Sequence, residues 1–120
     1  MSLNDTFCIS ETMTATVAEN ASLTETIACR GLRLASVTLP SAWTTANLTF
    51  QTSFDEGATW VDLHDQNGNE VVAVAAPGVC TVLFPSLFAS LRFVRVRSGT
   101  SLTPIAQEAA RSLILILRAV

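Results

Sequence analysis

The amino-acid sequence predicts an all-β fold, a two-sheet antiparallel β-sandwich of about nine short strands. Runs rich in Val, Ile, Leu and Thr alternate with polar residues along the chain, which is the pattern of half-buried strands. Gly, Pro and Asn punctuate these runs at regular intervals, and no stretch carries a strong helix pattern. A jelly roll or a related sandwich therefore fits the chain best.

The N-terminal part of the chain is expected to contribute an arm and the first strands. Residues 1–10 are expected to form a mobile arm, and residues 11–120 a single sandwich domain. Strands are predicted over residues 12–18, 23–30 and 32–39. In the last of these the apolar phase slips near Ala35 and Ser36, which indicates a β-bulge.

A hairpin over residues 48–65 is the clearest element of the sequence. Its arms, residues 48–53 and 60–64, alternate with period two, and a glycine between them can adopt the positive φ of the turn. The pattern S-x-D-x-G-x-T-W, called an Asp box, is formed by Ser53, Asp55, Gly57, Thr59 and Trp60. In such a turn the carboxylate accepts hydrogen bonds from backbone amides, and the tryptophan is expected to pack inward.

Asp boxes are typical of sialidase-like propellers, but this chain does not fit that architecture. A propeller repeats a four-stranded blade several times, whereas this sequence of 120 residues contains a single box and no internal repeat. We therefore interpret the box as a structural hairpin and not as part of a catalytic domain.

The remaining strands are predicted over residues 70–75, 79–84, 91–97 and 111–120. Asn67-Gly68 and Pro77-Gly78 mark turns between them. The final strand is apolar on both faces from Leu113 to Leu117. Such a strand is either central and covered, or its outer face meets another subunit.

Three side chains are candidates for ligand contact. Trp43, in the loop of residues 40–46, either plugs one end of the sandwich or offers a flat surface to a ligand. Arg92 and Arg95, with Arg97 on the same strand, could cradle an acidic partner or a sugar. The alternative for these arginines is an ion pair with acidic residues on adjacent strands or subunits.

The sequence lacks the motifs of an enzyme or a metal site. His64, the only histidine, lies between Asp62 and Asp65, but a lone imidazole poorly supports a transition-metal site. Residues 65–70 are rich in oxygen ligands, as a calcium loop is, yet a hairpin turn explains them as well. No nucleophile elbow and no glycine-rich phosphate loop occur. We expect no enzymatic activity, no metal and no cofactor.

Composition favours assembly with other subunits. Hydrophobic residues make up 49% of the chain and charged residues 14%, well below the roughly 25% charged residues of typical soluble domains. We expect another subunit to cover part of the apolar surface; a well-packed monomer rich in Ala and Thr is the alternative. The net charge of −3 and the lack of a basic cluster beyond residues 92–97 argue against nucleic acid as a partner.

Targeting signals and disulfides are not expected. The N-terminus has neither the basic region nor the apolar core of a signal peptide, and no apolar run is long enough to span a membrane. The cysteines are Cys8, Cys29 and Cys80, an odd number that argues against a disulfide framework. Cys29 and Cys80 lie in apolar strand-like runs and are predicted to be buried thiols, and a cross-link through Cys8 has no support in the sequence.

Two segments resemble known families. LTFQTSFDEGATWVDLHDQNGNEVV, followed later by Arg92-Phe93-Val94-Arg95-Val96, is similar to the second half of discoidin-type and other galactose-binding-like jelly rolls. Those pieces are scaffold in that family, so the resemblance implies the fold more than sugar binding. In this chain Glu56 replaces the glycine that usually follows the aspartate, and Gly57 comes next, so the turn is shifted or longer.

The second resemblance covers most of the chain. The sequence from LRLASVTLPSAWTTANLTFQTSFDEGATWVDLHD through LRFVRVRSGTSLTPIAQEAARSLILILR looks like small proteins of prophage and gene-transfer-agent heads and tails. It implies a structural subunit of a phage-like particle, such as a decoration, spike or fibre-base protein. Such a protein would be made in the bacterial cytoplasm and would pair with copies of itself or with other virion and tail proteins. The alternative function is a carbohydrate-binding module that recognises host glycans.

Overall fold

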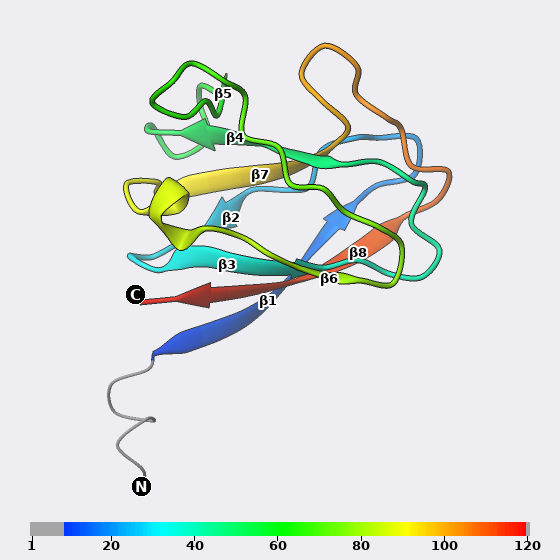
Figure 1. Cartoon of the computed structure of the whole chain (residues 1–120), viewed down its shortest axis with the longest axis horizontal. Helices are drawn as coiled ribbons and strands as arrows, with labels where there is room; N and C mark the ends of the chain where they lie inside the picture. Colours follow the sequence, from blue (N-terminus) through cyan, green and yellow to red (C-terminus); the bar gives the residue numbers. More distant parts are fainter. Residues whose placement is uncertain (1–8, 120) are drawn as a thin grey trace, which may run out of the picture.

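The chain folds as two four-stranded antiparallel sheets packed face to face, in a computed structural model that describes residues 9–119 (Figure 1). Sheet A has the strand order β1-β8-β3-β6. Its strands are β1 (Ser10–Val17), β8 (Arg111–Arg118), β3 (Arg33–Thr38) and β6 (Cys80–Val82). Sheet B has the order β2-β7-β4-β5. Its strands are β2 (Ile27–Ala28), β7 (Phe93–Ser98), β4 (Leu48–Ser53) and β5 (Val61–Asp62). The predicted all-β, two-sheet sandwich is confirmed.

The structure has eight strands where the sequence predicts about nine, because residues 70–75 do not form a ladder. The open edge of β4 is shared between two segments: Leu63 donates its amide to Phe50, and Ala73 exchanges both backbone hydrogen bonds with Leu48. Residues 70–75 are therefore left with isolated bridges at Glu70 and Ala73. Between β6 and β7 the chain makes one short 3-10 helix, η1 (Pro85–Phe88). No helix within residues 9–119 is long and apolar enough to cross a membrane.

The register of sheet A follows from its apolar alternation. In β8, Leu113, Leu115 and Leu117 point into the core, and the residues between them point outward. β1 pairs with one side of β8 over its full length, and β3 pairs with the other side. The pairing of β3 with β8 shifts between Leu34 and Ser36, which confirms the predicted β-bulge. The bulge lets Leu34 and Val37 both face the core despite their odd spacing.

The space between the sheets is filled by a single cluster of apolar side chains. Leu34, Val37 and the inward leucines of β8 face Phe50, Val94 and Val96 of sheet B, and all are at most 1% exposed. Phe88 of η1 enters the same cluster and meets Phe50 edge to face, with ring centroids 5.0 Å apart. Each such fully buried side chain stabilises the fold by about 1.5–3 kcal/mol relative to its exposed state.

The cysteine prediction is half right. Cys29 is buried, as expected, and burial raises the pKa of its thiol to about 11. Cys80 is exposed, so its predicted burial is wrong. Cys80 lies in β6 and pairs with Thr38 of β3, and the side chains of this pair point out of the sandwich. Cys8 and nearly all of the expected arm, residues 1–10, lie outside the described residues, and Ser10 begins β1.

Candidate functional site

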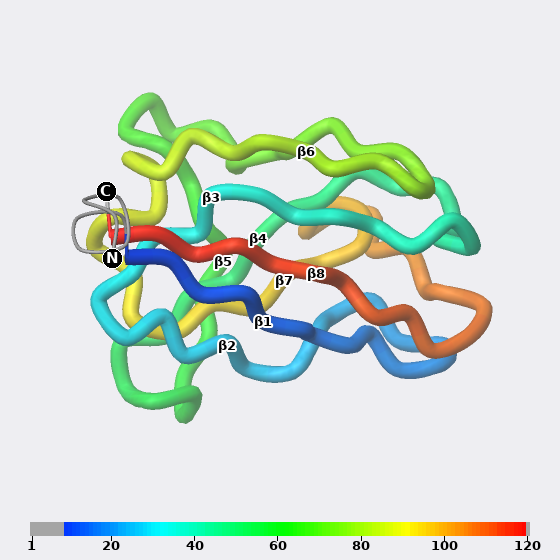
Figure 2. The backbone as a smooth tube through the Cα atoms, turned by 90° about the horizontal axis from the view of Figure 1, so that it is seen from below, coloured from blue at the N-terminus to red at the C-terminus, as the bar shows by residue number. Residues whose placement is uncertain are grey.

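The outer face of sheet A has two central rows of side chains that carry no charge. The register aligns the side chains of β1, β8, β3 and β6 straight across the sheet. One row is Thr12, Ile116, Ser36 and Val82, and the next is Thr14, Ile114, Thr38 and Cys80. Figure 2 looks onto this sheet, and within residues 9–119 none of its outward side chains is buried.

The isoleucines of this face break the usual rule for a solvated strand. A strand with one face in water normally places polar residues there, but β8 places Ile114 and Ile116 among threonines. Ile114 is 45% exposed and Val82, in the same face, is 81% exposed. The sequence prediction that β8 is apolar on both faces therefore holds, and its outer side meets no other segment that the structure describes.

A second apolar region continues from this face around the open side of the sandwich. Val72, Val74 and Phe84 are 45%, 78% and 77% exposed. With Val82 they line a groove of about 220 Å³ between the edge strand β6 and residues 71–74, and its floor includes buried Leu83 and Phe88. Val82 belongs both to this groove and to the outer face, so the exposed apolar side chains of the two regions are contiguous. We call the outer surface of sheet A, with its two central rows, the sheet A face, and this neighbouring region the β6 edge.

The predicted Asp-box residues meet in one turn, with the exception of the tryptophan. Ser53 Oγ accepts the amide of Gly57 at 2.8 Å and donates to Asp55 Oδ1 at 2.8 Å. The same carboxylate oxygen accepts the amide of Thr59 at 2.8 Å. The Ser53 hydroxyl, followed by the Thr59 amide, holds the pKa of Asp55 below its usual value. Gly57 has φ +93°, which the turn requires.

Trp60 does not pack inward. It is partly exposed and lies outside the core cluster, and the Arg95 guanidinium stacks over its ring at 4.0 Å from the centroid. The cation–π contact explains this placement, because it stabilises the ring on the outer side of sheet B. It also occupies one face of the Trp60 ring and one face of the Arg95 guanidinium.

Trp43 is buried, and its predicted alternative as an open ligand platform is wrong. The side chain is 3% exposed, and its indole Nε1 donates to the carbonyl of Ala46 at 3.2 Å. The plug that the sequence offered as the other interpretation is what the loop forms. Arg92 is exposed and lines a shallow hollow of about 310 Å³ with Phe54. The three ligand-contact candidates are therefore not assembled into one site.

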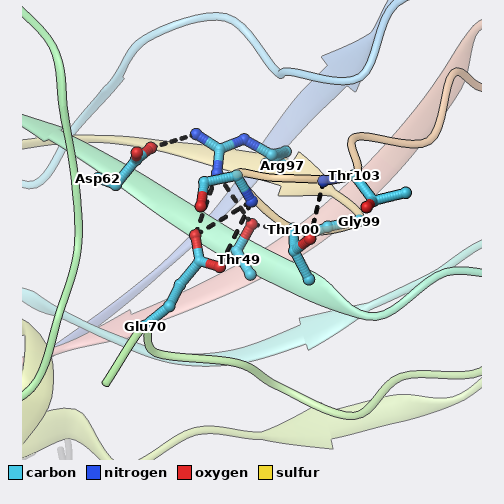
Figure 3. Close-up of polar contacts among 8 residues, drawn as sticks. Thr49, Asp62, Glu70, Arg97, Gly99, Thr100 and Thr103 are labelled. Carbon is cyan, nitrogen blue, oxygen red and sulfur yellow. Dashed lines mark hydrogen bonds and ion pairs between the residues drawn. The ribbon is translucent and has the colours of Figure 1, made fainter. Parts of the chain in front are cut away.

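Arg97 is the centre of a buried polar cluster on sheet B (Figure 3). The residue is 4% exposed; its Nη2 pairs with Asp62 Oδ1, and its Nη1 lies 3.3 Å from Glu70 Oε2. Glu70 also accepts the amide of Ser101, which ties the loop after β7 to the cluster. The hydrogen bond from Arg97 holds the pKa of Asp62 below its usual value. The predicted ion pairing with acidic residues is thus confirmed for Arg97, but its partners lie beyond the neighbouring β4, on β5 and in the segment that follows it.

Gln107 is a structural residue that the sequence did not reveal. Its side chain is fully buried; Oε1 accepts the amide of Thr44, and Nε2 donates to the Thr44 carbonyl and to Ser98 Oγ. These bonds fasten the segment before β8 to the Trp43 loop. A polar residue in a segment of small and polar residues carries no periodic signal, so only the three-dimensional structure identifies it.

The structure gives no support to metal chemistry at His64. Within residues 9–119 no group of three His, Cys, Asp or Glu side chains lies close enough to hold a metal ion. Asp65 Oδ1 is instead used by the turn, where it accepts the amides of Asn67 and Asn69 at 2.9 and 3.0 Å. Residues 65–70 therefore form the hairpin turn that was the alternative to a calcium loop.

Comparison with known proteins adds a likeness of fold. No protein-family model matches the chain, and no curated protein matches its sequence. Among solved structures, the chain is similar to the SPBc2 prophage-derived protein YomS, with 13% sequence identity and a TM-score of 0.49. The match covers 92% of this chain and 95% of that one.

Proposed function

We propose that this protein is a structural subunit of a phage-like particle that acts by protein–protein assembly through the sheet A face. The observation that carries the proposal is that this face has no charged side chain in its two central rows and exposes Ile114 and Val82. Exposed apolar patches of this kind mark interaction surfaces in soluble proteins. The particle context rests on the resemblance of residues 32–118 to small prophage and gene-transfer-agent proteins.

Other features agree with assembly as the main activity. The hydrophobic content of 49% and the charged content of 14% leave few groups to solvate a free subunit. The polar groups at Arg97 and at Asp55 bond to other groups of the same cluster, so these clusters stabilise the fold. The alternative function, carbohydrate binding, has lost its aromatic platform with the burial of Trp43 and the stacking of Arg95 on Trp60.

Light scattering coupled to size-exclusion chromatography tests the proposal. We expect the wild-type protein to elute with a mass above the 12.8 kDa of the chain at high concentration. Ile114→Arg places a charge in the centre of the face and is expected to restore the monomer mass. Leu102→Arg is the matched control, because Leu102 is 93% exposed in the loop after β7, which is tied to sheet B and lies away from the sheet A face. A wild-type protein that stays monomeric, or an assembly that Ile114→Arg leaves intact, would contradict the proposal.

A further inference from the structure

We infer that the sheet A face is occupied by a second copy of this chain, stacked face to face with its strands antiparallel to those of the first. The inference rests on the proposed function, since it names the partner of the same face. Three features of the face carry it: its central rows are uncharged, its charge is confined to its ends, and its area is sufficient for a weak symmetric pairing.

The two ends of the face differ in charge. At one end the row of Ser10, Arg118 and Arg33 places two arginines side by side. Within residues 9–119 neither has an ion-pair partner, and the ion pairs there belong to Arg97. At the other end Thr16 and Ser112 are neutral, with their hydroxyl oxygens 3.4 Å apart. Exposed Glu25 lies at this end, where its Oε1 accepts the amide of Thr16.

This asymmetry selects one orientation of a symmetric pair. Two identical faces stack through a two-fold axis that lies between them, directed either along the strands or across them. An axis along the strands would bring Arg33 and Arg118 of both copies to the same end, and four like charges would repel one another. An axis across the strands places this cationic end of one copy over the opposite end of its partner, where the outward Thr16 and Ser112 are neutral and Glu25 is exposed. Charge therefore favours the axis across the strands, which makes the stacked strands antiparallel.

The same axis brings the uncharged rows of the two copies together. The two uncharged rows flank the row of Leu115, so an axis across the strands above Leu115 places each row over the other row of the partner. Ile114 then packs on the partner's Ile116, and each copy repeats the contact, as an isologous interface requires. β1 lies over the partner's β1 in this arrangement, whereas an axis along the strands would lay it over the partner's β6.

The size of the face indicates how strong the pairing is. The strands of sheet A have 8, 8, 6 and 3 residues, so a spacing of ~4.8 Å and a rise of ~3.3 Å per residue give a face of roughly 400 Å². Two such faces bury about 800 Å², in the range of weak and transient interfaces. We therefore expect a dimer that exchanges subunits and depends on concentration.

Cross-linking between paired variants tests the orientation. In a background of Cys8→Ser and Cys80→Ser, subunits with Thr12→Cys are mixed with subunits carrying either Thr14→Cys or Val82→Cys. The buried Cys29 remains in all of them. A short bismaleimide bridges the ~10 Å between stacked sheets, which is too far for a disulfide. Antiparallel stacking predicts cross-linked heterodimer for the Thr12→Cys and Thr14→Cys mixture, and only background heterodimer for the mixture with Val82→Cys.

The opposite pattern would overturn the inference, because cross-linking of Thr12→Cys with Val82→Cys requires the axis along the strands. A dimer mass without cross-linking in either mixture would also overturn it, since the sheet A face would then not be the shared surface. Light scattering on the same samples separates these outcomes from the failure of the proposed function itself. A monomer mass at all concentrations contradicts both, whereas a dimer with the wrong cross-link contradicts only the second-copy geometry.

Discussion

Replacing Arg97 with methionine should destabilise the fold strongly, because the arginine neutralises two acidic groups on the outer side of sheet B. Methionine keeps the length and much of the packing of the stem but removes the charge. Glu70, whose side chain is 16% exposed, then loses its cation, and Asp62 loses its main partner. Breaking a buried ion pair costs about 3–5 kcal/mol. Asp62 is 36% exposed and water screens its share, so we expect a loss of about 2–3 kcal/mol.

Urea unfolding followed by tryptophan fluorescence measures this loss. The midpoint should fall while the slope of the transition stays unchanged. Arg92→Met is the matched control: Arg92 is exposed and makes no ion pair within the described part of the chain, so a change below about 0.5 kcal/mol is expected. A loss below about 1 kcal/mol for Arg97→Met would refute the interpretation that the buried pair is strongly coupled.

The same variant should alter the dependence of stability on pH. Arg97 lowers the pKa of Asp62 in the folded state, so the carboxylate stabilises the fold above its unfolded pKa of about 3.9. That contribution is lost as the pH falls from this value through the lower, folded pKa. The wild-type protein should therefore lose stability in acid more steeply than Arg97→Met does. Equal acid dependence of the two proteins would show that Asp62 is not held by Arg97.

Three further changes test individual features of the fold. Gly99→Ala should destabilise by more than about 2 kcal/mol in urea, because φ is +90° and the added Cβ would lie 2.5 Å from the Thr103 carbonyl oxygen; a neutral effect would refute the close approach. Gln107→Ala should cost about 1–3 kcal/mol and speed amide exchange at Thr44, since it leaves buried groups without partners; unchanged exchange would contradict its anchoring role. In the folded protein at a dilution that keeps it monomeric, Cys80 should react with a thiol reagent at pH 8 and Cys29 should not, because Cys29 is buried with a pKa of about 11; labelling of Cys29 before unfolding would contradict this.

The sequence predicts most of the strands because their periodicity reports burial. The hairpin of residues 48–65, the bulge near Ala35 and the doubly apolar β8 all follow from alternation and turn chemistry. Residues 70–75 are as rich in valine as the true strands, yet they form no ladder. Whether a neighbouring backbone edge is free depends on pairing between distant segments, and no local pattern reports that.

The candidate site residues show the same limit. The hydrogen bonds of the turn around Asp55 are local, so spacing alone predicted that its residues act together. The burial of Trp43 and Trp60 could not be predicted from the sequence, because it depends on the residues that pack against each ring. Trp43 is buried in the core cluster, whereas Trp60 is covered by Arg95, a contact that joins segments distant in sequence. Gln107 is recognised as an anchor only when Thr44 and Ser98 are seen beside it.

Hydroxyl-radical footprinting of the assembled protein, read by mass spectrometry, tests the central claim most directly. In the single chain Ile114 and Val82 are 45% and 81% exposed, and the control side chains Phe54 and Leu102 are 74% and 93% exposed. On going from dilute to concentrated protein, oxidation of Ile114 and Val82 should fall while oxidation of Phe54 and Leu102 stays constant. Concentrated protein in which Ile114 remains as reactive as in the dilute sample would contradict assembly through the sheet A face.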